Sequence, residues 1–308
     1  MSAAATPVRA PSPTGRQFEL RLAEQTAVIT EVGASLRRYA DGGRDVVVPF
    51  GAHEQAPGSH GAVLLPWPNR IGDGTYVFDG EEHRLALTEP ERRTALHGLV
   101  QHTRWIPMAH TDRHLRLALD LVPRPGYPFP LHTEICYTLG EDGLTVDLAT
   151  TNPGTRTAPY GVGFHPWLSP GRHRLDDCTL QVDAAGWVRP DERLLPLAET
   201  ELPRRLDFLR PRRLGTLALD DGFVDVPRAS TVRLTDPDGV AALCWAEDWV
   251  GCWQLCTGDG LPGEYARSGL AAEPMTCAAD AFRTGRRVIA LTPGQTHEVR
   301  WGLRTERP

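Results

Sequence analysis

Two residues in distant parts of the chain are separate candidates for acid–base chemistry. Glu273 stands among small and apolar residues in the run Ala271-Ala272-Glu273-Pro274-Met275, where burial of a carboxylate without a partner would be costly and would raise its pKa. His165 follows two glycines and precedes Pro166, a context that orients a side chain rather than packing it in a regular strand. In isolation, each is also compatible with a hydrogen-bonded structural residue.

Other segments could bind a polar ligand. Pro66-Trp67-Pro68-Asn69-Arg70 is a rigid loop, whose Trp face suits an apolar sugar face and whose Arg offers planar donors. His97 stands in Ala95-Leu96-His97-Gly98-Leu99, and an acidic turn, Asp220-Asp221-Gly222, comes later. A surface ion pair for Arg70 and plain turn chemistry for Asp220 are the simpler interpretations of these two segments taken alone.

Composition excludes several classes of function. The 308 residues carry a net charge of −6 and contain no lysine, so a nucleic-acid or membrane partner is not expected, and Schiff-base or P-loop lysine chemistry is excluded. No apolar run approaches the roughly 20 residues of a membrane span. The leader at residues 1–16 lacks the apolar core of a signal peptide. We expect a flexible leader and a soluble, cytoplasmic protein.

Metal and nucleophilic chemistry find little support in the motifs. Neither an HExxH sequence nor an EF-hand loop occurs, and no G-x-S-x-G elbow is present. The six cysteines are scattered without paired CxxC spacing, which favours buried thiols over a disulfide scaffold or metal site. We therefore expect no metal and no cofactor.

The elements that must position these residues are mostly short β-strands. Period-2 alternation or β-branched enrichment, with turn residues between the runs, predicts strands at 17–23, 27–32, 45–50, 75–78, 83–87, 114–122, 132–139, 144–151, 179–182, 231–234, 240–245, 287–291 and 297–303. No helix longer than two or three turns is predicted. No linker or repeat divides residues 17–308, so we expect a single all-β domain, built as a large two-sheet antiparallel β-sandwich.

Taken in order, the motifs resemble the aldose 1-epimerase (mutarotase) family. The similarity runs through PWPNRIGDGTYVFDG, LHGLV, TNPGT, GFHPW, LDDGF, QLCTGD, EPMTCAADAF and LTPGQTHEVRWGL, which together span nearly the whole chain after about residue 30. Within the family, the motifs PWPNR, LTEPE and LHGLV resemble most the bacterial branch that contains sulfoquinovose mutarotases. The resemblance implies a galactose mutarotase-like supersandwich and the interconversion of sugar anomers without a cofactor.

The resemblance also implies roles for single residues. Glu273 matches the catalytic base of the family and His165 its catalytic acid. The implied substrate-binding residues are Arg70, His97 and Asp220, with Asn69, Asn152, Gln254 and Trp167 as further candidates. Asp221 is an alternative to Asp220, because a shift of one residue would exchange them. Trp167 stands where galactose mutarotases usually carry Tyr, which leaves the preferred sugar open.

These residue types suit the opening of a pyranose ring, which removes a proton from O1 while the ring oxygen gains one. The alternatives are a carbohydrate-binding module without catalysis, a glycosidase that uses Glu273 and Asp220 as a carboxylate pair, and a hexose-6-phosphate 1-epimerase. The expected partner is a small-molecule sugar, and the chain is expected to be a monomer or a homodimer.

Overall fold

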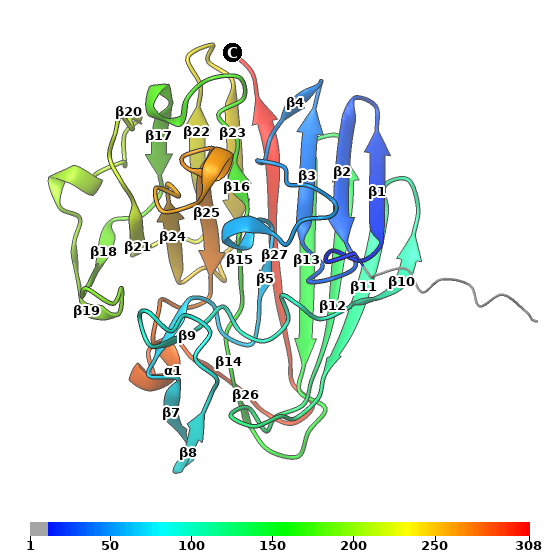
Figure 1. Cartoon of the computed structure of the whole chain (residues 1–308), viewed down its shortest axis with the longest axis vertical. Helices are drawn as coiled ribbons and strands as arrows, with labels where there is room; N and C mark the ends of the chain where they lie inside the picture. Colours follow the sequence, from blue (N-terminus) through cyan, green and yellow to red (C-terminus); the bar gives the residue numbers. More distant parts are fainter. Residues whose placement is uncertain (1–11) are drawn as a thin grey trace, which may run out of the picture.

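The computed structural model describes residues 12–308 and shows two layers of antiparallel β-sheet (Figure 1). A nine-stranded sheet forms one layer. An eight-stranded sheet and a four-stranded sheet lie side by side against it and form the other. An isolated bridge between Val47 and Leu168 joins the two smaller sheets. The prediction of a large all-β sandwich is confirmed.

The nine-stranded sheet contains the longest strands of the described chain. In spatial order its strands are β10 (Ile106–His110), β11 (His114–Leu121), β12 (Leu131–Gly140), β13 (Gly143–Thr151), β27 (Thr296–Glu306), β23 (Ala241–Ala246), β22 (Ser230–Thr235), β17 (Thr179–Val182) and β20 (Arg212–Arg213). In β12, buried and half-buried residues alternate strictly, as expected for a strand with one face in the core.

The opposite layer carries most of the candidate residues. Its eight-stranded sheet consists of β19 (Pro196–Glu201), β18 (Gly186–Pro190), β21 (Asp220–Val224), β24 (Cys252–Cys256), β25 (Leu270–Met275), β15 (Gly163–Phe164) and β5 (Val63–Leu64), with β16 (Trp167–Leu168) also paired to β25. The four-stranded sheet is β1 (Gln17–Leu22), β2 (Gln25–Thr30), β3 (Leu36–Asp41) and β4 (Arg44–Asp45).

Short strand pairs lie at one end of the sandwich, at the bottom of the view (Figure 1). They are β6 (Arg70–Gly72) with β9 (Thr94–Leu96), β7 (Thr75–Phe78) with β8 (Glu81–Arg84), and β14 (Ala158–Tyr160) with β26 (Ile289–Leu291). The β6–β9 pair supplies the remaining candidate residues.

Helices in the described residues are short, as predicted. They comprise α1 (Ala281–Thr284) and the 3₁₀ turns η1 (Pro57–Ser59), η2 (Leu175–Asp177), η3 (Arg204–Leu206) and η4 (Gly263–Tyr265). Within the described range, no helix is long and apolar enough to cross a bilayer.

The expected leader falls partly outside the described residues, because residues 1–11 are not among them. Thr14 is buried and donates a hydrogen bond to the carbonyl of Ala52, as does Ser12. The described end of the leader therefore contacts the domain, while the flexibility expected of residues 1–11 stays a prediction.

Of the six free cysteines, Cys178, Cys244, Cys252 and Cys277 are buried, and Cys136 and Cys256 are half-buried.

Candidate active site

His165 and Glu273 face each other across two strand segments. β15 and β16 both pair with β25, through Gly163 opposite Met275 and Trp167 opposite Ala271. Counting along this antiparallel register places His165, in the gap between β15 and β16, opposite Glu273. The two side chains meet there, with His165 Nε2 3.3 Å from Glu273 Oε1. The interruption of the strand thus occurs where the candidate acid–base pair forms.

Burial shifts the pKa values of this pair in opposite directions. Glu273 is 2% exposed and His165 5% exposed. Burial raises the pKa of Glu273 well above its usual value, and the negative charge of Asp220 adds to this effect. Burial lowers the pKa of His165 well below its usual value, with a further contribution from His97. Both shifts favour a neutral carboxylic acid beside a neutral imidazole.

The next two strands extend the site across the sheet. Gln254 of β24 pairs with Glu273 in register, and its Nε2 donates to Asp220 Oδ1 of β21 at 2.7 Å. Asp220 Oδ2 lies 3.9 Å from Arg70 Nη2. Burial raises the pKa of the Asp220 carboxyl, although Arg70 opposes the shift.

Asp220, and not Asp221, belongs to this group. Successive residues of a strand point to opposite faces. Asp221 accepts hydrogen bonds from Trp187 Nε1 at 2.8 Å and from Arg205 Nη2 at 3.1 Å, on the other face of β21. The alternation within β21 thus resolves the one-residue ambiguity that the sequence leaves open.

Arg70, Asn69 and His97 come from the β6–β9 region. Asn69 and His97 both have a left-handed backbone, with φ of 57° and 61°, which is uncommon outside glycine and concentrates at functional sites. The two residues hold each other: the Asn69 N–H donates to His97 Nδ1 at 3.2 Å, and the His97 N–H donates to the Asn69 carbonyl at 2.9 Å. The next residue is a glycine, Gly98, because a Cβ at that position would lie only 2.1 Å from the Leu65 carbonyl oxygen.

His97 is fixed in one neutral tautomer. Burial, with a contribution from the positive charge of Arg70, lowers its pKa to about 3, so the ring is uncharged at pH 7. Because Nδ1 accepts the Asn69 N–H, the ring proton resides on Nε2. His97 therefore offers an N–H donor next to His165, whose ring centroid lies 5.3 Å away.

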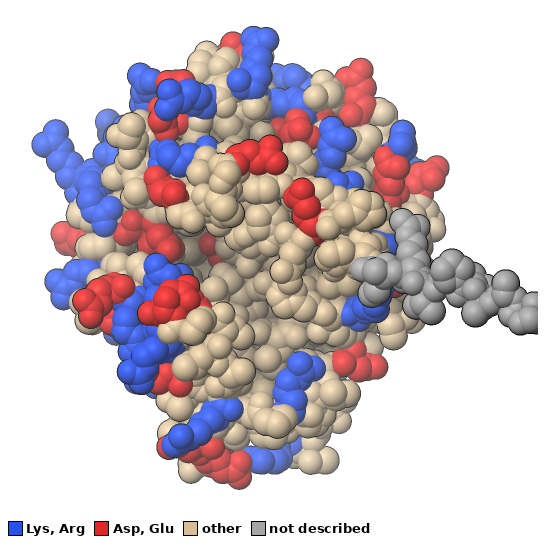
Figure 2. Space-filling view, in the orientation of Figure 1, with Lys and Arg blue, Asp and Glu red and all other residues tan. Residues whose placement is uncertain are grey.

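A cavity lies at the Asp220 side of this group, and Arg70, His97, His165 and Glu273 are not among its lining residues. Asn69, Asp220, Gly222 and Gln254 line it together with the apolar Val188, Pro190, Leu194, Pro196, Ala278 and Ala279. Figure 2 shows a hollow in this face of the molecule, with acidic and basic side chains gathered on its left rim. A Cβ on Gly222 would lie 3.3 Å from Gln254 Oε1, so the glycine leaves room for that side chain at the cavity wall.

Trp167 packs against His165, and neither residue lines the cavity. It is 2% exposed and its Nε1 donates to the Gly58 carbonyl at 3.2 Å. Its ring stacks on His165 with centroids 5.7 Å apart and on His60 with centroids 4.5 Å apart. This position suits the orientation of the His165 ring better than contact with a ligand. His60 was not identified from the sequence.

Two further residues suggested by the motifs are used elsewhere. Trp67 is buried, packs against Tyr127 and Phe282, and donates to the Ala95 carbonyl. Asn152 is fully buried, and its side-chain amide forms hydrogen bonds with the backbone. Its Nδ2 donates to the carbonyls of residues 156 and 291, and its Oδ1 accepts a hydrogen bond from the N–H of residue 154. Both have structural roles in this arrangement.

Ligating atoms of His97, His165 and Glu273 lie within 4.8 Å of one another, close enough in principle for one metal ion. A metal-bound histidine normally carries its proton on the other ring nitrogen and donates it to an acceptor. His97 Nδ1 instead faces the Asn69 N–H, a donor, which leaves the proton on the nitrogen that would have to bind the metal. The cluster therefore fits a metal ion poorly and a hydroxyl-bearing ligand well.

Comparisons with known proteins show the family to which the chain belongs. The family model described as aldose 1-epimerase matches residues 16–304. The uncharacterized protein YihR of Escherichia coli is 31% identical over 298 residues, which cover 96% of this chain and 94% of YihR. Galactose mutarotase of Sus scrofa is 28% identical over 184 residues, and the match spans about half of each protein, 56% of this chain and 52% of the mutarotase.

Solved structures share the fold. A putative aldose 1-epimerase from Escherichia coli superposes with a TM-score of 0.83 at 24% identity, covering 95% of this chain and 99% of that one. An aldose epimerase homologue from Caenorhabditis elegans gives a TM-score of 0.84 at 18% identity, with the same coverage of both chains. With a family model that matches nearly its whole length, this chain belongs to the aldose 1-epimerase family.

Proposed function

We propose that the protein is a mutarotase that interconverts the α and β anomers of a free aldohexose or a related sugar by acid–base ring opening. The observation that supports this most strongly is the buried contact between Glu273 and His165, which lie opposite each other in the strand register at 3.3 Å. Glu273 Oε2 is also buried without a hydrogen-bond partner. A sugar hydroxyl would satisfy it.

The proposed chemistry needs one base and one acid. The Glu273 carboxylate removes the proton from the C1 hydroxyl while protonated His165 gives a proton to the ring oxygen, and the bond from C1 to the ring oxygen breaks. Once the open-chain aldehyde has formed, Glu273 is a neutral carboxylic acid and His165 is a neutral imidazole. Rotation about the C1–C2 bond and the reverse proton transfers close the ring as the other anomer.

Ring closure returns the pair to its starting form without solvent. After ring opening both groups are neutral, which is the form that burial favours, and the reverse transfers return one proton from Glu273 to O1 and one from the former ring oxygen to His165. Before a sugar reacts, one proton moves across the 3.3 Å contact from the carboxyl to the imidazole and gives the charged pair.

The surrounding residues would bind the sugar and stabilise developing charge. Arg70 and the Nε2–H of His97 would donate to ring oxygens or hydroxyls, and Asp220, fixed by Gln254, would accept hydrogen bonds from hydroxyls remote from C1. Asn69 contributes mainly by holding His97.

The alternative functions gain less support. A binding module has no use for a buried acid–base pair. A glycosidase needs a second carboxylate as its partner for Glu273, but the group in contact with Glu273 is His165. A hexose-6-phosphate substrate would need free cations near Asp220. The two arginines that affect the pKa of Asp220, Arg70 and Arg92, both contact Glu89.

Anomer-exchange NMR tests the proposed function. Glucose, galactose, glucose 6-phosphate and sulfoquinovose are incubated with the protein, and the exchange rate between anomers is compared with that in buffer. Acceleration for at least one free sugar supports a mutarotase, and the fastest sugar identifies the substrate class. Binding without acceleration for any sugar would instead indicate a carbohydrate-binding module.

Asp220→Asn is expected to raise the KM of the sugar roughly 10-fold or more, with a smaller change in kcat. Hydrogen bonds to a charged group contribute about 1.5–3 kcal/mol, and those from Asp220 would be remote from the reacting bond. Saturation kinetics of anomer exchange measure both constants. Asp221→Asn is the matched control, because Asp221 contacts Trp187 and Arg205 on the other face. An equal KM increase in both variants would contradict the assignment of Asp220.

The pH dependence should show no loss of activity near the usual pKa of histidine. The active pair holds one proton, so activity falls only when His165 gains a second proton or when the last proton leaves Glu273. Burial lowers the pKa of His165 well below 6.5 and raises that of Glu273, which moves the two limits apart. We therefore expect kcat/KM not to fall as the pH is lowered from about 7.5 to about 6. An acidic limb with its midpoint at 6.5 would contradict this.

A further inference from the structure

Glu89, the first of the two glutamates in the LTEPE sequence, has no role in the proposed reaction, yet it is only 7% exposed and carries four side-chain hydrogen bonds. It accepts from Arg70 Nε at 2.8 Å and Arg70 Nη2 at 3.0 Å, from Arg92 Nη1 at 2.8 Å and from Thr94 Oγ1 at 2.6 Å. Burial disfavours its charge, but Arg70 and Thr94 still hold the pKa of Glu89 below its usual value. With this many donors, the buried carboxylate of Glu89 is ionised at neutral pH.

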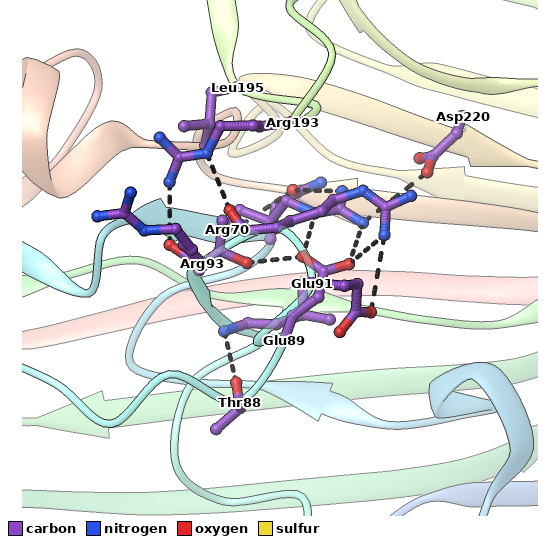
Figure 3. Close-up of polar contacts among 12 residues, drawn as sticks. Arg70, Thr88, Glu89, Glu91, Arg93, Arg193, Leu195 and Asp220 are labelled. Atoms are coloured by element: carbon purple, nitrogen blue, oxygen red, sulfur yellow. Dashed lines mark hydrogen bonds and ion pairs between the residues drawn. The ribbon is translucent and has the colours of Figure 1, made fainter.

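The contact with Glu89 fixes which edge of Arg70 is free. A guanidinium has a planar fork of donors, and a bidentate carboxylate occupies one edge of it. Glu89 takes the edge formed by Nε and Nη2. The remaining donors have only weak partners in the protein: Nη1 is 3.5 Å from Asn69 Oδ1, and Nη2 is 3.9 Å from Asp220 Oδ2. Arg70 therefore keeps donors available on the side of Asp220 (Figure 3).

The segment that carries Glu89 is itself held from two sides. Glu89 and Thr94 exchange both backbone hydrogen bonds, each at 3.1 Å, which closes the loop between β8 and β9. Arg193, from the turn between β18 and β19, donates to the carbonyl of Arg92 at 2.9 Å and to that of Arg93 at 3.0 Å. Figure 3 shows Arg193 above this loop and Glu89 below Arg70. The position of Glu89 is thus set by the fold rather than by Arg70 alone.

Without Glu89, the nearest anion for Arg70 would be Asp220, which is already 3.9 Å away. A guanidinium drawn into a direct pair with Asp220 would use the donors and acceptors that the sugar needs. We infer that Glu89 is a positioning residue: it anchors Arg70 away from Asp220 and keeps both side chains open to the substrate. The inference rests on the proposed function, because it assigns how one substrate-binding residue of that site is held.

The test is Glu89→Gln, which keeps the size of the side chain and removes its charge. We expect kcat/KM to fall roughly 10- to 100-fold, mainly through KM, as for the loss of hydrogen bonds to a charged group. Glu91→Gln is the matched control: it lies in the same loop, but its carboxylate is two-thirds exposed and only approaches Arg92, at 3.9 Å. This control should keep the wild-type constants.

A double-mutant cycle shows whether Glu89 acts through Arg70. In an Arg70→Gln background, Glu89→Gln should cause no further loss of kcat/KM, because the group that it positions is gone. Equal losses in both backgrounds would overturn the inference, and so would wild-type kinetics of Glu89→Gln. Where Glu89→Gln fails to fold, Thr94→Val removes one of the four hydrogen bonds of Glu89 and should raise KM by a smaller factor, whereas an unchanged KM would overturn the inference.

A readout without catalysis separates this inference from the proposed function. The Nε–H resonance of Arg70 in a ¹H–¹⁵N spectrum, assigned by its loss in Arg70→Gln, should be shifted and slow to exchange in the wild type. It should lose both properties in Glu89→Gln but not in Glu91→Gln. A wild-type protein that fails to accelerate anomer exchange while this signal behaves as expected would overturn the mutarotase proposal alone. An Nε–H signal unaffected by Glu89→Gln would overturn the positioning role alone.

Discussion

Glu273→Gln is expected to lower kcat for anomer exchange roughly 10²- to 10⁴-fold, the usual contribution of one proton-transfer group. The glutamine amide has nearly the same shape and can still contact His165 Nε2, but it cannot accept the proton of the C1 hydroxyl. Sugar binding should change little, since Arg70, His97 and Asp220 are untouched. Exchange kinetics over a range of sugar concentrations separate kcat from KM.

The same variant should be at least as stable as the wild type. Glu273 is buried, one of its oxygens has no partner, and burial raises its pKa, so a neutral amide removes the cost of burying this acid. Thermal unfolding therefore checks that lost activity is not lost fold. Glu199→Gln, at a partly exposed position of the same sheet, is the control and should stay within about twofold of the wild-type kcat. A Glu273→Gln variant with near-normal kcat would refute the proposed base.

Sequence patterns predicted the large sheet far better than the strands of the site. In that sheet the strand at 179–182 has the predicted bounds, the strand at 132–139 differs from β12 by one residue at each end, and the strand at 144–151 differs from β13 by one residue at its start. These strands alternate between a buried and a more exposed face. Alternation is the signal that sequence periodicity detects, so strands with one face in the core are the ones it finds.

The strands that carry the site were not predicted, for a physical reason. β25 is buried at every position and contains Pro274, and β24 is buried except at its end. A short strand covered on both faces shows no alternation, and a proline argues against a central strand. The opposite error occurred at 45–50, where the apolar run predicted a strand. The observed strand is only Arg44–Asp45. After it, the Val46 carbonyl accepts a hydrogen bond from the N–H of Ser169, and the N–H of Val48 donates to the carbonyl of Trp167.

The candidate residues themselves were found by motif, but their relative positions depend on the strand register. The motifs placed Glu273 and His165 in the same site without showing that they touch. The choice between Asp220 and Asp221 required the alternation of β21, and the packing role of Trp167 is visible only in its stacks on His60 and His165. Glu89 was part of a quoted motif, but nothing in the sequence indicated that its partner is Arg70.

His165→Asn should lower kcat by a similar factor, roughly 10²- to 10⁴-fold, because asparagine cannot carry a proton to the ring oxygen. The side chain is smaller and loses the stacking on Trp167, so some loss of stability is expected as well. Kinetics are therefore compared with thermal unfolding, and the exposed His132→Gln serves as a control for a histidine outside the site.

The combination of both variants tests whether the two residues act as a unit. In the proposed mechanism Glu273 and His165 act in the same ring-opening step, one as base and one as acid, so removal of either residue disables that step. The double variant Glu273→Gln/His165→Asn should then retain about the activity of the weaker single variant, since residues that act together are strongly non-additive. Losses that multiply in the double variant would mean that the two groups act independently, and the joint acid–base step would have to be abandoned even though each residue contributes to turnover.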